Sequence, residues 1–452
     1  MSDILSQDEM EVLAEKALEI AQKAGAECVD VLINSGSASS IEVRKGAIEL
    51  IERSEVLELG LRTFIGQRQA LVSGSDLSQS ELLAMGERAV HMAREAPIDI
   101  YCGLAQPEQL AKSWDIKSLK LFDSEPPPTG KKLENFAKGA EEAARGVLGI
   151  EQAESSASYY TNQTLLMASN GFKGSYKSSS ISISCTAIAG SGSEMERDYN
   201  WERRIHQNEI PVPEDIGKKA GERARARLNP RKLVTGRYPV IFDQRVSSSL
   251  ISHLLGLIRG DVLVRGSSWL IDSLGETILP ATSSLIEEPL RPACIGSIPF
   301  DAEGLPKKEC SIVKNGKLKT YLLDLSSARK LNAIPTGHAV RGVSSLPTPS
   351  VSNIALTPGK KGKEELIAEM GTGLLITSLL GATINPNTGD YSRGAAGVWV
   401  EHGEPCYPIN ECTVAGNLRD MLRNFVPSND AELHRPSRIP SILIHDMQIA
   451  GA

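Results

Sequence analysis

The sequence predicts an α+β fold with mixed β-sheets and helices. It has an N-terminal α/β region, a candidate for internal duplication, followed by a C-terminal β-rich domain. Two observations support this. The order helix, strands, helix occurs twice before about residue 235. After that point, strands and helices interleave without a regular βαβ rhythm, which favours mixed sheets.

The first unit, residues 1–125, begins and ends with a predicted helix. Ser6 and Glu9 have the S-x-x-E spacing of a capping box, in which each side chain satisfies a free backbone N–H group. Apolar residues then recur at helical spacing as far as Gly25, which suits a C-terminal cap. A second helix begins near Ser78, with Glu81 in the same box position.

Between these helices the sequence predicts about four strands. The segments "CVDVLI", "SIEVRKGAIELI" and "VLELGLRTFIGQRQALV" alternate apolar and polar residues. Lys45-Gly46 and Gly66-Gln67 are predicted hairpin turns.

The proline-rich segment "DSEPPPTG" (123–130) interrupts the periodicity and is a linker candidate. The middle unit, residues 126–235, repeats the earlier order. A helix is predicted over 131–148, strands follow around "SSASYY", "TLLMASNGFKGSYK" and "SISISCTAIA", and a helix covers 213–228. The order of elements is the only sign of a duplication.

The C-terminal domain is predicted to span residues 236–452 and to be rich in hairpins. In "SIVKNGKLKTYLLD", Asn315-Gly316 fits a type I′ turn. The segment "GVWVEHGEPCYPI" is a second hairpin that turns near Gly403. "AGNLRDMLRNF" starts a helix, and "PSILIHDMQIAG" is a final strand.

Composition excludes several classes of partner. The net charge of −7 argues against broad nucleic-acid binding, and the basic run at 218–232 is expected to be a solvated helix end. The longest nearly apolar stretch, 374–384, is far shorter than the ~20 residues of a membrane span. The acidic N-terminus lacks signal-peptide order, and seven cysteines lack a C-x-x-C pair. We therefore expect a cytoplasmic protein that contacts neither nucleic acid nor membrane.

The stretch "SSSLISHLLGLIRGD" (247–261) has the appearance of a zinc helix. Such a helix needs two histidines four or five residues apart and a glutamate to act as base. Leu254 follows His253, and apolar residues occupy the second position. We predict a core or interface histidine with a hydrogen-bonded ring. His338, in the Gly-rich "PTGHAVRG", stays open between a structural and a functional role.

The segment "TGDYSRGAAG" (388–397) is unusual because Asp, Tyr, Ser and Arg are packed among glycines. We predict a binding or subunit-contact loop. Asp390 and Arg393, three residues apart, are expected to pair or to grip a peptide.

A longer stretch, 370–425, resembles the TldD/PmbA family on its PmbA (TldE) branch. The pieces "MGTGL", "GDYSRGAAG", "AGNL" and the terminal "IAG" carry the resemblance. It implies zinc metallopeptidases that act on small or unfolded polypeptides, in peptide-antibiotic maturation or antitoxin breakdown. It also implies a heterodimer, in which the TldD subunit holds zinc with an H-E-x-x-x-H helix and a cysteine from its C-terminal region. An older description of the family is modulator of DNA gyrase.

The resemblance places this chain on the side without zinc ligands. Aligned on Gly260-Asp261, the ligand positions fall near Ile251 and Gly256, which cannot bind zinc. No cysteine follows Cys412. We therefore predict no catalytic residue, metal ligand or cofactor in this chain, and expect zinc in the partner.

The leading hypothesis is the non-catalytic subunit of a heterodimeric peptidase, so whether this chain alone is an enzyme stays open. A homodimeric peptide-binding or regulatory protein, akin to a DNA gyrase modulator, is the alternative. A self-sufficient peptidase with unrecognised ligands is a third. The residues predicted to bind substrate or partner are Asp390, Tyr391, Ser392, Arg393 and Asn417.

Overall fold

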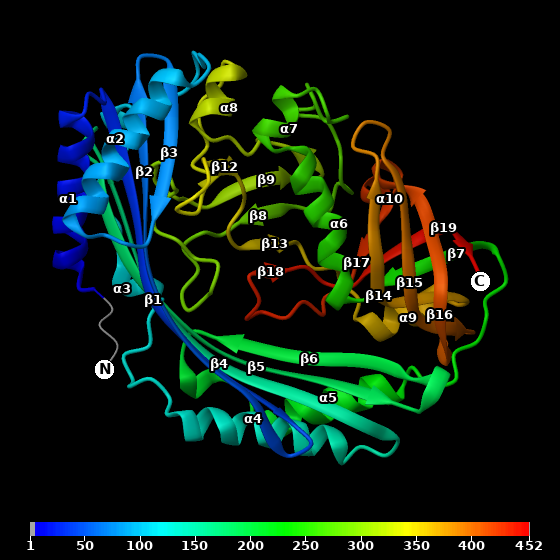
Figure 1. Ribbon diagram of the computed structural model, residues 1–452. Coiled ribbons are helices and arrows are strands. Elements are labelled where there is room, and N and C mark those ends of the chain that lie inside the picture. The colour runs from blue at the N-terminus through cyan, green and yellow to red at the C-terminus, as the bar shows by residue number, and fades with distance from the viewer. Residues whose placement is uncertain (1–4, 452) are drawn as a thin grey trace.

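An antiparallel six-stranded sheet forms the N-terminal half of the molecule (Figure 1). The computed structural model describes residues 5–451. The strand order is β3-β2-β1-β4-β5-β6. The strands are β1 (Cys28–Arg44), β2 (Ala47–Ile65), β3 (Arg68–Gly74), β4 (Ile150–Ala168), β5 (Lys173–Ala189) and β6 (Glu196–Arg204). Because β1 pairs with β4, the first two predicted units share one sheet.

Helices cover the convex face of this sheet, and the C-terminal domain lies on its concave side (Figure 1). The helices are α1 (Gln7–Lys23), α2 (Gln79–Glu95), the short α3 (Ile116–Leu119), α4 (Gly130–Arg145) and α5 (Pro213–Arg225). The order helix, three strands, helix occurs twice, as the sequence pattern predicted. The first unit has three strands rather than about four, because the Ser-rich segment 35–40 continues β1 and pairs on both sides.

The predicted capping boxes had different outcomes. At α1 the Ser6 amide donates to Glu9 Oε2 (2.7 Å), and the Glu9 amide donates to Ser6 Oγ (3.3 Å). At α2 the Ser78 side chain makes no cap hydrogen bond, so that prediction is wrong. The Ser78 amide instead donates to Asp76 Oδ1, and its hydroxyl lies beside Ser80. A local turn has replaced the box.

The predicted hairpin turns are confirmed. The pairs Lys45-Gly46 and Asn315-Gly316 have positive φ at both residues (53° and 74°, 50° and 76°), the combination that a type I′ turn requires. His402 and Gly403 turn in the same way between the last long hairpin's strands (φ 54° and 81°).

Five strands of the C-terminal domain close into a barrel. They are β7 (Gly236–Phe242), β14 (Gly373–Ile384), β15 (Asp390–Glu401), β16 (Glu404–Asn417) and β19 (Ile442–Ala450). Pairing between β16 and β19 closes it, and β17 (Val426–Pro427) adds to β19. The fold is therefore α+β with mixed sheets and a β-rich C-terminal domain, as predicted.

A second sheet and short helices complete this domain. The sheet has the order β10-β9-β8-β13-β18, and β11 pairs with β12. These strands are β8 (Leu285–Glu287), β9 (Cys310–Lys314), β10 (Lys317–Leu318), β11 (Ala339–Val340), β12 (Thr348–Pro349), β13 (Ile354–Leu356) and β18 (Ser437–Arg438). The helices are α6 (Gln244–Leu257), α7 (Gly260–Val264), α8 (Leu325–Lys330), α9 (Lys363–Met370) and α10 (Leu418–Asn424). Within residues 5–451, no helix is long and apolar enough to cross a membrane.

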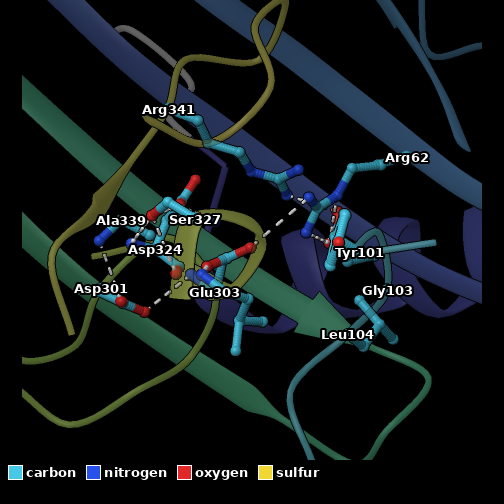
Figure 2. Close-up of polar contacts among 12 residues, drawn as sticks. Arg62, Tyr101, Gly103, Leu104, Asp301, Glu303, Asp324, Ser327, Ala339 and Arg341 are labelled. Carbon is cyan, nitrogen blue, oxygen red and sulfur yellow. Dashed lines mark hydrogen bonds and ion pairs between the residues drawn. The ribbon is translucent and has the colours of Figure 1, made fainter. Parts of the chain in front are cut away.

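A buried ion cluster joins the N-terminal sheet to the C-terminal domain (Figure 2). Arg62 on β2 donates through Nε to Asp30 Oδ2 on β1 (2.8 Å). Arg341 Nη2 lies 2.7 Å from Asp30 Oδ1, and Glu303 Oε1 lies 3.9 Å from Arg62 Nη1. All four side chains are at most 4% exposed. Charges so far from water require partners, so the cluster favours one docking geometry of the two parts.

The acidic groups of the cluster have opposite pKa shifts. Burial alone would raise the pKa of Asp30, but Arg341 and Arg62 hold it below its ordinary value. Burial raises the pKa of Glu303 to about 8, and Arg62 only partly opposes this. Asp30 is therefore the anion on which both guanidinium groups depend.

Asp30→Asn should lower the free energy of unfolding by roughly 3–5 kcal/mol, because it leaves two buried cations without their shared anion. Asp446→Asn is the matched control, since it breaks an exposed pair with Arg237 (side chains 62% and 63% exposed). Exposed pairs contribute about 1 kcal/mol or less. Urea unfolding of both variants gives the comparison, and equal losses would contradict the cluster's structural role.

Gly217 should not tolerate a side chain, because α4 and α5 cross there. A Cβ at this position would lie 1.8 Å from the carbonyl oxygen of Ala140. Gly217→Ala should cost roughly 1–3 kcal/mol through overpacking. Gly256→Ala on α6 is the control, since a Cβ there meets nothing within 4 Å. Thermal unfolding should show a lower midpoint for the first variant only.

Candidate functional site

A pocket of about 620 Å³ lies where α6, the barrel and β6 meet. Its walls carry arginines, serines and one histidine. The polar lining residues are Arg197, Asp198, Tyr199, Arg227, Arg245, Ser248, Ser249, Ser252, His253, Thr377, Ser378, Arg393 and Asn410. These come from the central and C-terminal units, so folding alone brings them together.

The apolar pattern of α6 positions its polar face toward this pocket. Asp243 caps the helix by accepting from the Arg245 amide (3.0 Å). One face, including Leu250, Ile251 and Leu254, is buried in the largest hydrophobic cluster. Ser248, Ser249, Ser252 and His253 line the pocket. The sequence predicted one helix over 247–261. The helix instead ends at Leu257, and a separate short helix begins at Gly260.

His253 is half-buried and faces the pocket without a polar partner. Its Nε2 atom is buried and has no hydrogen-bond partner within the described residues. The predicted hydrogen-bonded ring is therefore wrong. The ring lies 6.3 Å from that of Tyr391. Burial lowers the pKa of His253 to about 4 and the Arg393 charge acts in the same direction, so the imidazole is neutral at pH 7.

The predicted loop at 388–397 is mostly strand. Only its first residues form the turn before β15, because residues from Asp390 onward pair with both β14 and β16. Asp390 and Arg393 do not pair, since residues three apart on a strand point to opposite faces. Asp390 accepts from the Thr388 hydroxyl (2.6 Å), and Arg393 Nε donates to the Gly381 carbonyl (2.7 Å).

The other predicted binding residues lie close together but are not all accessible. Tyr391 is buried, and burial raises its pKa to about 12 although Arg393 opposes the shift. Ser392 is half-buried. Asn417 pairs with Asp390 in register, caps α10 through the Arg419 amide (3.1 Å) and donates to the Thr388 carbonyl (3.0 Å). In this structure Asn417 holds a turn, and Arg393 alone of the set lines the pocket.

Sequence reasoning missed the arginines that β6, α6 and the segment after α5 bring to the pocket, which are Arg197, Arg245 and Arg227. Arg245 pairs with Asp198 of β6, and Arg227 Nε lies 3.1 Å from Glu196 Oε2. Arg223 donates to Asn200 Oδ1 (2.9 Å). The basic run at 218–232 is therefore not simply a solvated helix end. No local pattern could reveal these contacts, because partners are separated by up to 47 residues.

His338 lies away from this pocket, in the core of the C-terminal domain. Its Nε2 atom is 2.7 Å from Glu287 Oε2, and Lys307 Nζ is 2.9 Å from Glu287 Oε1. All three side chains are at most 3% exposed. Burial would raise the pKa of Glu287, but His338 and Lys307 lower it to about 2. These contacts give His338 a structural role.

The sequence matches known proteins along nearly its whole length. Residues 235–451 match the PmbA/TldA metallopeptidase C-terminal domain, residues 122–228 the central domain and residues 29–93 domain 1. The metalloprotease PmbA of Escherichia coli O157:H7 is 35% identical over 98% of this chain and 96% of that protein. This chain belongs to the PmbA/TldD family, on its PmbA (TldE) branch.

Other members of the PmbA/TldD family agree in sequence and fold. A metalloprotease PmbA homologue of Haemophilus influenzae is 36% identical over 96% of this chain and 94% of its own. A crystal structure from Bacteroides thetaiotaomicron, named as a modulator of DNA gyrase, superimposes with a TM-score of 0.92 over 99% of this chain and all of that one, at 28% identity. TldE from Thermococcus kodakarensis shares the fold (TM-score 0.81, 19% identity, 97% and 100% covered).

Family membership implies zinc, but the residues on α6 do not fit it. Ile251 is buried in the core, and Gly256 has open space beside it but no donor atom. Cys412 is buried, donates to the Ala395 carbonyl (3.2 Å), and has a pKa that burial raises to about 11. Within residues 5–451, no three His, Cys, Asp or Glu side chains gather as a metal site. Arg393 beside His253 would also repel a cation.

Arg393→Gln should raise the pKa of His253, because it removes a cation that disfavours the imidazolium ion. The rise should be partial, since burial is the larger cause. NMR titration of the seven histidines gives the measurement. Arg88→Gln, an exposed arginine on α2, is the control and should leave this pKa unchanged. An unaltered His253 titration in Arg393→Gln would mean that the two groups do not interact.

Proposed function

We propose that this chain is the non-catalytic subunit of a two-chain metallopeptidase. It would associate with a TldD-like subunit and help to hold a small or unfolded peptide while the partner cleaves it. One observation carries the proposal: α6 lines its pocket with serines, His253 and Arg245, and the expected ligand positions hold Ile251 and Gly256. A pocket of this kind suits binding better than metal chemistry.

The concave face of the N-terminal sheet supports a role in holding peptide. On β5, Ile183 packs toward the helices, so its neighbours Ser182 and Ser184 face the opposite side. On β6, Tyr199 and Trp201 are 47% and 40% exposed. Serine hydroxyls and exposed aromatic rings together bind varied peptides, because they combine adaptable hydrogen bonding with large, rigid contact areas.

We further propose that the chain acts in the cytoplasm and contributes to peptide-antibiotic maturation or antitoxin degradation. The family resemblance suggests both the compartment and the processes. All seven cysteines are free, which supports a reducing compartment.

Two other functions would give different experimental results. A homodimeric peptide-binding or regulatory protein would bind peptide without increasing a partner's cleavage. The name of the Bacteroides relative, modulator of DNA gyrase, supports a regulatory function. A self-sufficient peptidase would need ligands outside α6, and the buried state of Cys412 and Glu287 disfavours those groups.

Co-expression with a TldD-like subunit should give a stable complex that cleaves unfolded peptide, and a chelator should abolish the cleavage. This chain alone should be inactive and should not retain zinc after dialysis. Stoichiometric zinc or cleavage by the isolated chain would exclude the non-catalytic role. Cleavage by the mixture no faster than by the partner alone would favour the regulatory protein.

Arg393→Ala should reduce cleavage by the mixed complex about tenfold or more, because a charge-assisted contact to the peptide is lost. The variant should keep its fold and its association with the partner, which circular dichroism and gel filtration measure. Arg88→Ala, which removes the same charge from the convex side, should cleave at the normal rate.

A further inference from the structure

We infer that the pocket between α6, β15 and β6 is a binding site for the carboxylate group of a peptide. The inference deepens the proposed function, because it names the chemical group by which this chain would hold the substrate. The site combines residues from three separate segments: Arg197 on β6, His253 on α6 and Arg393 on β15.

The charge of the pocket walls favours an anionic ligand. Four arginines line the pocket against one aspartate, Asp198. Two of them are already neutralised, since Arg245 pairs with Asp198 and Arg227 pairs with Glu196. Arg197 and Arg393 have no carboxylate partner within the described residues. The walls therefore retain excess positive charge, and an anion is the complementary ligand.

Arg393 is held in a fixed orientation in the pocket wall. Its Nε atom donates to the Gly381 carbonyl at 2.7 Å, which fixes the guanidinium group at the edge of the barrel. The Tyr391 hydroxyl lies beside the guanidinium group, and no carboxylate of the described residues pairs with it. A guanidinium group that is fixed through Nε and has no carboxylate partner matches the two oxygens of a ligand carboxylate.

His253 lies beside Arg393 in the pocket wall. Its Nε2 atom is buried without a hydrogen-bond partner, whereas buried polar atoms usually have one. Because this atom is out of reach of solvent, the neutral imidazole contributes a desolvated wall beside Arg393, which strengthens the attraction of the guanidinium group for an anion. Ser252, one residue earlier, donates its own proton to the Ser248 carbonyl (2.9 Å) and lies exposed on the same face.

The surroundings of the pocket favour a peptide as the source of the carboxylate. About 620 Å³ is enough for several residues rather than a lone small ion. Tyr199 lines the pocket, and Trp201 follows it on the same face of β6. Aromatic rings beside a guanidinium group suit a peptide chain. Its terminal carboxylate, or the carboxylate of an acidic residue, would lie at the arginine.

The test measures binding of fluorescent peptides to this chain alone by anisotropy. Three peptides share one sequence: a free C-terminal acid, its C-terminal amide without acidic residues, and the amide with one internal glutamate. The free acid should bind at least about tenfold more tightly than the plain amide. Tight binding of the glutamate peptide would assign a side-chain carboxylate as the source and would equally support the site. Equal binding of free acid and plain amide would overturn the inference, as would displacement by inorganic phosphate but not by acetate.

Two variants locate the site. Arg393→Gln and Arg197→Gln should each weaken binding of the free acid about ten- to hundredfold and remove its advantage over the amide. Arg197 is exposed and makes no described contact that folding requires, so its variant remains informative if Arg393→Gln unfolds. Arg88→Gln is the matched control and should bind as the unaltered chain does. Wild-type binding by both pocket variants would overturn the inference.

The carboxylate site and the proposed subunit function can be tested independently. Binding is read on the isolated chain, whereas subunit function is read as cleavage by the mixed complex. Cleavage without carboxylate discrimination would remove the inference alone, and discrimination without any gain in cleavage would remove the subunit role alone.

Discussion

The buried ion cluster around Asp30 is the constraint on which the rest of the structure depends. It connects strands β1 and β2 to segments of the C-terminal domain that carry Arg341 and Glu303. Isolated charges in this environment would cost several kcal/mol each, so an alternative docking that separated them would be strongly disfavoured. The sheet and the C-terminal domain are therefore held in one relative position. That position determines what β6, at the far edge of the same sheet, can contact.

At that far edge the docking produces the pocket. Asp198 and Glu196 of β6 meet Arg245 and Arg227, and Asn410 of the barrel donates to Glu196 (2.7 Å). These pairs align β6 with α6 and leave the remaining arginines directed at open space. The helix that the family resemblance assigns to metal binding in the TldD subunit is here surrounded by positive charge. A cation and an anion need opposite surroundings. The lack of metal ligands on α6 therefore agrees with the carboxylate site that we infer beside it.

Some features of the fold could be predicted because they depend on neighbours in the sequence. The capping box at Ser6 and the type I′ turn at Asn315-Gly316 involve residues at most three apart. The capping box at Ser78 failed locally, because Asp76 forms a turn there. Another prediction failed where a second segment competed. Residues from Asp390 onward were expected to be a loop, because glycines and polar residues are common in loops. Pairing with two neighbouring strands made them the middle of a barrel wall, and the strand then directed Asp390 and Arg393 to opposite faces.

The sequence by itself determined the fold class, the periodic faces of the helices, the turns and the absence of ligand-type residues at positions 251 and 256. It also determined the family, because the segment around "GDYSRGAAG" is specific. Only the tertiary structure decided that His253 lacks a hydrogen-bond partner and that Arg197 and Arg393 face one pocket. The physical reason is the distance along the sequence over which each feature is determined. Helix periods and turns are encoded over a few residues, whereas the electrostatic environment of a side chain is set by segments that meet only when the sheet and the barrel dock.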